Sequence, residues 1–486
     1  MRRLHVVALA ASAVIAVTCG ARCLRSHRAA RPIAQTSRTG RNVQLARIGL
    51  DVGSTYAAAS ARKLFASAPR RVEIDAQRQL RTAEHVAERL GQMKGALMKV
   101  GQMASYLDDG LPEPVRNALA ELQANAPPMS SELAAQVIAE ELGGPPEKIF
   151  LDWDPDPIAA ASIGQVHRAV IGDPDTGAER AVAVKVQYPG VAEAIAADLQ
   201  NTDLIGMFLR QTFRSLDPAD LVAEIKQRLG EELDYHRERD NQQRFVDYYR
   251  GHPYFSVPEV VHHLCTARVL TTDLAVGATW RDALTWEQGE RDLIGEGLFR
   301  FVFRSLYRMQ AFNGDPHPGN YLFHGDGRIT FLDFGLVRYF SPDEIAVFAG
   351  LVKAAAVDRD AATFRALVER AGLLLPGAPV DTAEVGDYFS DFYAPVAQDA
   401  PMTWTKEYAS QIVRHTFDRS SPIAQYATVP RAFVFIQRIN LGLYALLGDL
   451  GARGNYRRMA EELWPFADGA PSTPMGTAER AWSRSR

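Results

Sequence analysis

The sequence predicts an α+β protein with two lobes, and three observations support this prediction. The chain of 486 residues is longer than one ordinary hydrophobic core needs, so two subdomains and tails are expected. Short apolar runs typical of strands lie in its middle, at 180–188 and 321–332. Longer stretches with helical periodicity lie on both sides of these runs. The composition, 47% hydrophobic and 23% charged, is that of a globular protein with an ample core.

The charge is distributed unevenly along the chain. Residues 1–71 contain thirteen Lys and Arg and a single acid, Asp51, whereas the whole chain has a net charge of −4. A basic arm on an acidic body indicates an anionic membrane surface or an import receptor as its partner. Nucleic acid is not expected, because no aromatic residues are interleaved with the basic ones. Three cysteines (Cys19, Cys23 and Cys265) make neither a disulfide framework nor a ligand cluster, which fits a reducing compartment.

An apolar run at residues 6–19 follows two arginines and is short for a transmembrane helix, which needs about 20 residues. It fits a signal sequence, a marginal membrane anchor or part of a targeting sequence. Four arginines follow the run at once, namely Arg22, Arg25, Arg28 and Arg31. Positive charge there favours retention of the downstream chain. We therefore expect a membrane-associated protein on the cytoplasmic or organelle matrix side.

The most informative stretch is 313–335. Asp315 and Asn320 lie in a loop rich in Gly and Pro, and two apolar runs around a His-Gly-Asp-Gly turn follow, which predicts a β-hairpin. The hairpin returns Asp333 of an Asp-Phe-Gly triplet to the loop where it began. Two carboxylates and an amide carbonyl are hard oxygen ligands of the kind Mg²⁺ takes beside nucleotide phosphates. The triplet alone is a weak signal, but the Asp-x4-Asn loop upstream makes it resemble half of a protein-kinase site.

A second strand pattern lies upstream of this loop. Val182, Val184 and Val186 alternate with polar or small residues, so Lys185 is predicted on the opposite face of the strand. Before it comes a loop of small residues, expected to cover the nucleotide phosphates: Ala159, Ala160, Ala161 and Ser162. The arrangement resembles the phosphate loop and the lysine strand of kinases. The alternative is an ordinary edge-strand lysine.

Residues 221–249 are predicted to form one helix that carries three acids. Asp234 and Glu238 share a face, and Glu232 lies about 200° away from Asp234 at 3.6 residues per turn. Glu238 is the candidate partner of Lys185, which leaves Glu232 to face another element. A solvated acidic stripe is the alternative.

Residues 72–123 also have helical periodicity. Lys99 and Gln102 are neighbours on a side of this helix away from its apolar seam, and a solvated face is the alternative for them. Further on, 268–274 is predicted as a strand, and 291–312, 362–371 and 432–450 as helices.

After Gly335 the chain leads directly to a helix start at Ser341, without Ala-Pro-Glu, so the peptide-docking shelf of protein kinases is expected to be missing. The expected domains are a basic targeting or anchor segment at 1–71, a helical extension at 72–150, an upper lobe at 151–275, a mostly α lower lobe at 276–466 and a disordered tail at 467–486.

These motifs, in this order, resemble the UbiB/AarF family of atypical protein-kinase-like ATPases over residues 72–465. The resemblance adds a Lys-x-Gly-Gln motif at Lys99–Gln102 and a Glu-x-Asp motif at Glu232–Asp234. It implies that the helical extension folds over the usual peptide cleft with these two motifs facing each other, in a regulatory role. It also implies support of isoprenoid quinone biosynthesis, with ATP and Mg²⁺ as cofactors and a membrane lipid, a quinone precursor or quinone-biosynthesis proteins as partners. The chain departs from some members in having no hydrophobic pair near its C-terminus.

The expected activity is that of an ATPase or atypical kinase. Lys185, oriented by Glu238, contacts the α- and β-phosphates, while Asn320 and Asp333 bind Mg²⁺ and Asp315 orients water or a substrate hydroxyl. Two alternatives remain open. One is a protein or small-molecule kinase, and the other is a nucleotide-gated scaffold without enzymatic activity.

Overall fold

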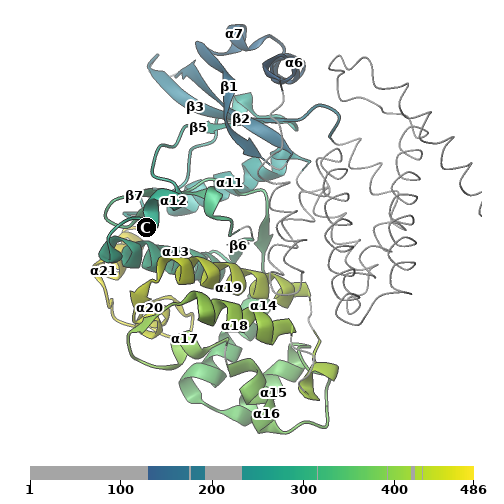
Figure 1. Cartoon of the computed structure of the whole chain (residues 1–486), viewed down its shortest axis with the longest axis vertical. Coiled ribbons are helices and arrows are strands. Elements are labelled where there is room, and N and C mark those ends of the chain that lie inside the picture. Colours follow the sequence, from purple (N-terminus) through teal and green to yellow (C-terminus); the bar gives the residue numbers. More distant parts are fainter. Residues whose placement is uncertain are drawn as a thin grey trace, which may run out of the picture. The chain divides into compact units, whose positions relative to one another are not determined.

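The computed structural model describes residues 130–161, 163–173, 177–191, 233–314, 316–390, 392–417, 422–428 and 431–486. All of these belong to one compact unit, Ala59–Arg486. A small antiparallel sheet and a larger, mostly helical part make up the described residues (Figure 1), so the predicted α+β fold with two lobes is confirmed. The upper lobe contains α6 (Ser131–Leu142), α7 (Pro146–Ile149), β1 (Asp152–Ala161), β2 (Gly164–Gly172), β3 (Glu179–Gln187), α11 (Tyr235–Tyr249), β4 (Phe255–Ser256), η1 (His262–Leu264) and β5 (Val269–Asp273).

The lower lobe follows after β5 and contains the longest helices. Its first elements are α12 (Trp280–Ala283), α13 (Gln288–Arg308), β6 (Ala311–Asn313), η2 (Pro318–Asn320), β7 (Tyr321–His324), β8 (Arg328–Phe331), β9 (Val337–Tyr339), α14 (Pro342–Val352), η3 (Lys353–Asp358) and α15 (Ala361–Arg370). The chain continues with α16 (Thr382–Ser390), α17 (Ala394–Ala397), β10 (Met402–Thr403), α18 (Lys406–Phe417), η4 (Pro422–Gln425), α19 (Arg431–Leu450), β11 (Arg453–Gly454), α20 (Tyr456–Leu463) and α21 (Pro474–Arg484).

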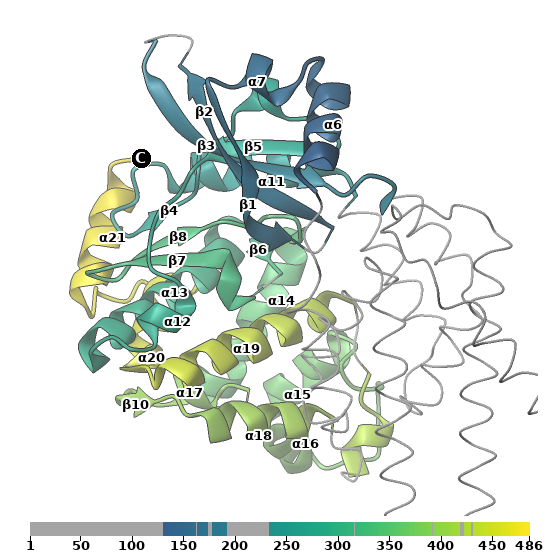
Figure 2. The ribbon, with the colours of Figure 1, turned by 45° about the horizontal axis from the view of Figure 1, so that its top comes forward.

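The upper sheet has the strand order β1-β2-β3-β5, with every neighbouring pair antiparallel. The alternation predicted for β3 is present, because Val182, Val184 and Val186 are fully buried. They pack in one core with Ala134, Val137 and Ile138 of α6, which lies beside the sheet in Figure 2. The sequence analysis assigned residues up to 150 to the helical extension, but α6 and α7 share the core of the upper lobe.

The helix that carries Glu238 is shorter than predicted. α11 begins at Tyr235, and the side chain of Asp234 accepts a hydrogen bond from the backbone N–H of His236. The prediction of one continuous helix from residue 221 was therefore wrong, because Asp234 is the N-cap of α11 and has extended backbone angles. Glu238 lies in the first turn of α11, where the positive end of the helix dipole favours a carboxylate.

The small residues predicted as a loop also differ. Ala159, Ala160 and Ala161 are the last residues of the edge strand β1, and they pair with β2 as far as Ala161 opposite Gly164. The prediction of an alanine loop was wrong here, because the pairing with β2 continues to the tip of the hairpin. Ser162, at the tip, lies outside the described residues.

Gly164 lies where β2 passes close to β3 and α11. A Cβ atom at this position would lie 2.3 Å from the carbonyl oxygen of Val186 and 2.9 Å from the Tyr235 hydroxyl. We expect Gly164→Ala to separate the strands and to destabilise the protein by about 1–3 kcal/mol, measured by chemical denaturation. The control is Gly172→Ala at the other end of β2, where the nearest atom, Cδ1 of Leu151, is 3.7 Å away. Equal stability of the two variants would contradict this expectation.

The lower lobe contains the predicted hairpin. β7 and β8 pair antiparallel around a turn in which Asp326 and Gly327 have positive φ angles. β4 pairs with β8 in parallel and so joins the chain after α11 to the hairpin. The long helices α13 and α19 pack with the hairpin in the largest hydrophobic core. After the Asp-Phe-Gly triplet only β9 precedes α14, which begins with a capping box between Ser341 and Glu344. The described chain thus has no docking shelf at this point, as predicted.

The predicted disordered tail is folded. α21 (Pro474–Arg484) is capped by Thr473 and packs with Met475, Gly476 and Glu479 buried. The prediction was wrong because the polar side chains of this helix find partners on α13, which lies far away in the sequence. Among the residues that the structure describes, none of the helices has the length and apolar character needed to cross a membrane.

Candidate nucleotide site

Lys185 of β3 and Glu238 of α11 form an ion pair between the sheet and the helix. The Nζ atom of Lys185 donates to both carboxylate oxygens of Glu238, at 2.7 Å and 2.9 Å. The two side chains are only 17% and 6% exposed. The sequence analysis expected this pairing, and the structure contains it. A bidentate contact of this kind fixes the direction of the lysine side chain.

The Asp-Phe-Gly triplet brings a second carboxylate to the same lysine. Oδ2 of Asp333 lies 3.7 Å from Nζ of Lys185, and Oδ1 of Asp333 accepts a hydrogen bond of 2.9 Å from the N–H of Gly335. Phe334 is fully buried and packs against Phe245 of α11, with ring centroids 4.7 Å apart. The triplet is therefore tied to the same helix that holds Glu238.

The lysine remains charged in this partly buried position. Burial by itself lowers the pKa of Lys185, but the charges of Glu238 and Asp333 outweigh it and raise that pKa well above its ordinary value. The ring of Tyr235 also lies 5.1 Å from Nζ, a distance at which an aromatic face attracts a cation. The site thus presents a fixed positive charge beside a carboxylate that is 31% exposed.

Asn320 lies at the open end of the same hairpin as Asp333. It ends the short helix η2 directly before β7, and its carbonyl oxygen accepts a hydrogen bond of 3.0 Å from the N–H of Leu332. The amide oxygen of Asn320 and the carboxylate of Asp333 are hard donors, which fit Mg²⁺. No three His, Cys, Asp or Glu side chains within the described ranges are close enough to hold a metal ion by themselves.

Several residues singled out from the sequence lie outside the described residues, namely Asp315, Ser162, Glu232, Lys99 and Gln102. The roles predicted for them stay predictions. Asp234 is described, and its side chain caps α11 rather than pointing along the helix face with Glu238.

Sequence reasoning missed two asparagines that hold the triplet. Asn241, one turn after Glu238 on α11, donates a hydrogen bond of 3.0 Å to the carbonyl oxygen of Phe334. Asn313 of β6 donates to the carbonyl oxygen of Asp333. The spacing of Glu238 and Asn241 places them on one helix face, and this signal could have identified Asn241.

It also missed His167 of β2, which joins the strands of the hairpin β1–β2. Its Nδ1 donates to the carbonyl oxygen of Asp154, 3.0 Å away, and its Nε2 accepts from the Gln165 side chain at 2.9 Å. Burial lowers the pKa of His167 and favours the neutral ring that this pattern needs. No local sequence signal distinguishes this buried histidine from an exposed one.

A lysine held by a helix glutamate and facing the aspartate of an Asp-Phe-Gly triplet, on a small sheet above a helical lobe, defines a protein-kinase-like fold. Comparison with known proteins agrees. Residues 121–368 match the ABC1 atypical kinase-like domain, so the chain belongs to that family, and the predicted UbiB/AarF resemblance is confirmed.

Named relatives come from several organisms. "Atypical kinase COQ8B, mitochondrial" of Rattus norvegicus is 36% identical over 290 residues, which cover 57% of this chain and 52% of the relative. "Protein ACTIVITY OF BC1 COMPLEX KINASE 8, chloroplastic" of Arabidopsis thaliana is 33% identical over 270 residues, 54% of this chain and 35% of the relative. The matched part thus spans about half or less of the length of these curated relatives.

A solved structure of the same fold, "The complex structure of Rv3197-erythromycin from Mycobacterium tuberculosis", superposes with a TM-score of 0.59 at 30% identity. It covers 82% of this chain and 99% of that chain.

Proposed function

We propose that this chain binds Mg-ATP and hydrolyses it as an atypical kinase-like ATPase. The observation that carries the proposal is the position of Lys185 between the carboxylates of Glu238 and Asp333. Phosphoryl transfer depends mainly on positioning and charge stabilisation, and a fixed lysine beside a partly exposed aspartate supplies both.

Each residue has a defined task in this proposal. Lys185 binds oxygens of the α- and β-phosphates, and Glu238 holds its direction. Asn320 and Asp333 hold Mg²⁺, which neutralises phosphate charge when it is bound there. Asp315 orients the attacking water or a substrate hydroxyl. Ala159, Ala160, Ala161 and Ser162 cover the phosphates at the tip of the hairpin β1–β2.

The proposed physiological role is support of isoprenoid quinone biosynthesis on the cytoplasmic or matrix side of a membrane. The COQ8 name among the relatives supports the quinone link, and the relatives named above are called mitochondrial or chloroplastic. An anionic membrane or a quinone-precursor lipid is the proposed partner. In this proposal Lys99 and Gln102 of the helical extension face Glu232 and Asp234 and close the peptide cleft.

The test is phosphate release by the full chain with Mg-ATP, measured without vesicles, with neutral vesicles and with anionic vesicles that contain a quinone-precursor mimic. We expect release that requires Mg²⁺, is suppressed by EDTA and rises with the anionic vesicles. Binding of Mg-ATP without release over hours would favour the scaffold, and efficient transfer to proteins would favour a protein kinase. No binding at all would refute the proposal.

A further inference from the structure

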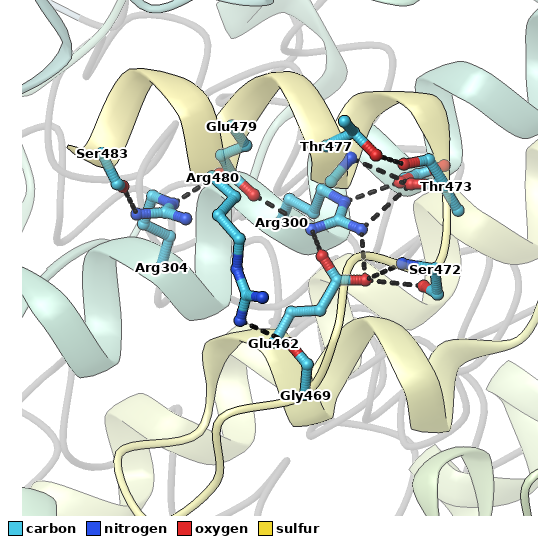
Figure 3. Close-up of polar contacts among 12 residues, drawn as sticks. Arg300, Arg304, Glu462, Gly469, Ser472, Thr473, Thr477, Glu479, Arg480 and Ser483 are labelled. Carbon is cyan, nitrogen blue, oxygen red and sulfur yellow. Dashed lines mark hydrogen bonds and ion pairs between the residues drawn. The ribbon is translucent and has the colours of Figure 1, made fainter. Parts of the chain in front are cut away.

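The last helix, α21, is fastened to α13 by buried charges. The carboxylate of Glu479 is 1% exposed and lies 3.0 Å from Nη1 of Arg300, and it also accepts a hydrogen bond from Arg304. Nη1 of Arg304 donates to the Ser483 hydroxyl at 3.1 Å, one turn further along α21 (Figure 3). These contacts place one side of α21 firmly on the lower lobe.

The other end of α21 contacts the end of α11. The last carbonyl groups of a helix have no partner within it. Here Arg486 donates to the carbonyl oxygens of Tyr248 and, at 2.7 Å, of Asp247, while the indole N–H of Trp482 donates at 3.2 Å to the carbonyl oxygen of Arg250. α11 has no basic residue in its own last turn, so Arg486 supplies the cation that the negative end of the helix dipole favours.

Aromatic packing strengthens the same contact. The ring of Trp482 lies parallel to that of Tyr249, with centroids 6.3 Å apart, and meets His252 edge-on at 4.5 Å. His252 in turn lies 3.4 Å from Glu479, so the capping contacts and the buried charges join at one place. α11 is thereby anchored at its C-terminal end to α21, and through it to α13.

α11 is also the helix that holds the lysine of the nucleotide site. Glu238 lies ten residues before Tyr248, a lever of about 15 Å at 1.5 Å per residue. A tilt of α11 by about 10° around its C-terminal end therefore moves Glu238 by about 2.5 Å. Such a movement is enough to break a contact of 2.7 Å between Lys185 and Glu238.

We propose that α21 is a positioning element for the nucleotide site, in which Arg486 and Trp482 hold α11 in the orientation that lets Glu238 pair with Lys185. The inference rests on the proposed function, because it concerns the lysine assigned there to the phosphates. Arg486 and Trp482 act through Glu238 and touch no substrate themselves.

The first measurement needs no nucleotide. Arg486→Ala is compared with Arg480→Ala, which removes the same charge from α21 but loses only contacts to Asp468 and the carbonyl oxygen of Gly469. Hydrogen exchange is followed in peptides that cover the first turns of α11, around Glu238. We expect about tenfold faster exchange in Arg486→Ala, the equivalent of one hydrogen bond to a charged group, and parental exchange in Arg480→Ala. Equal exchange in the two variants would overturn the proposal.

The second measurement separates positioning from general stability. The affinity for a non-hydrolysable Mg-ATP analogue is measured for Arg486→Ala, Glu238→Gln and the double variant. If α21 acts through Glu238, Arg486→Ala weakens binding about tenfold in the parent chain and not in the Glu238→Gln chain, and Arg486→Lys restores most of the loss. Additive losses would overturn the proposal. If the parent chain binds no nucleotide while α11 loosens in Arg486→Ala, the proposed function is wrong and the positioning of Glu238 by α21 stands.

Discussion

Asp333→Asn should lower the rate of ATP hydrolysis by at least about 100-fold, the usual cost of removing one preorganised electrostatic group from a reaction site. The substitution keeps the size of the side chain, and Oδ1 can still accept the hydrogen bond from Gly335. It removes the charge that lies 3.7 Å from Lys185 and one hard oxygen donor proposed for Mg²⁺. The measurement is phosphate release with saturating Mg-ATP.

The matched control for this variant is Asp326→Asn in the turn of the same hairpin. Asp326 has a φ of 65°, which asparagine tolerates, and its backbone N–H contacts Glu290 away from the lysine. We expect parental hydrolysis from this control and similar melting temperatures for both variants. Hydrolysis by Asp333→Asn at the parental rate would show that the assignment of this carboxylate is wrong.

Arg300→Met should lower the melting temperature on the order of 10 °C, which corresponds to the roughly 3–5 kcal/mol lost when one partner leaves a buried charge network. Arg300 is 0% exposed and contacts three carboxylates, at 2.6 Å (Glu296), 2.9 Å (Glu462) and 3.0 Å (Glu479) (Figure 3). Methionine fills much of the volume but leaves these carboxylates without their shared cation. Thermal unfolding monitored by circular dichroism is the measurement.

The electrostatics of Glu479 show why the loss is large. Burial alone raises the pKa of Glu479, but the contacts with His252, Arg304 and Arg300 outweigh it and lower the pKa to about 2. The ionised form is therefore kept in the interior by its partners. Arg480→Met is the control, because its partner Asp468 is 97% exposed, and we expect almost no change in its melting temperature. In the double variant Arg300→Met with Glu479→Gln, the losses should be less than additive, since the two residues share one contact. A melting temperature within a degree of the parent for Arg300→Met would contradict this account.

The sequence alone determined the features that depend on neighbouring residues. The alternation of valines around Lys185 placed this side chain opposite the buried face of β3, because strand side chains alternate with a period of two. The turn between the apolar runs at 321–332 determined the hairpin that returns Asp333 to Asn320. Ser341 and Glu344 determined the start of α14 through a capping box that spans three residues.

Only the tertiary structure decided where α11 begins and that the last residues are folded. Asp234 caps α11 instead of continuing a longer helix, although its local pattern also fits a helix interior. Residues 474–484 are polar and basic, which locally indicates disorder, but Glu479 is buried by arginines that precede it by more than 170 residues. The free energy of such contacts depends on partners that a local pattern does not contain, so the charge network, the capping of α11 by Arg486 and the link between the last helix and Glu238 follow from the packing of distant segments.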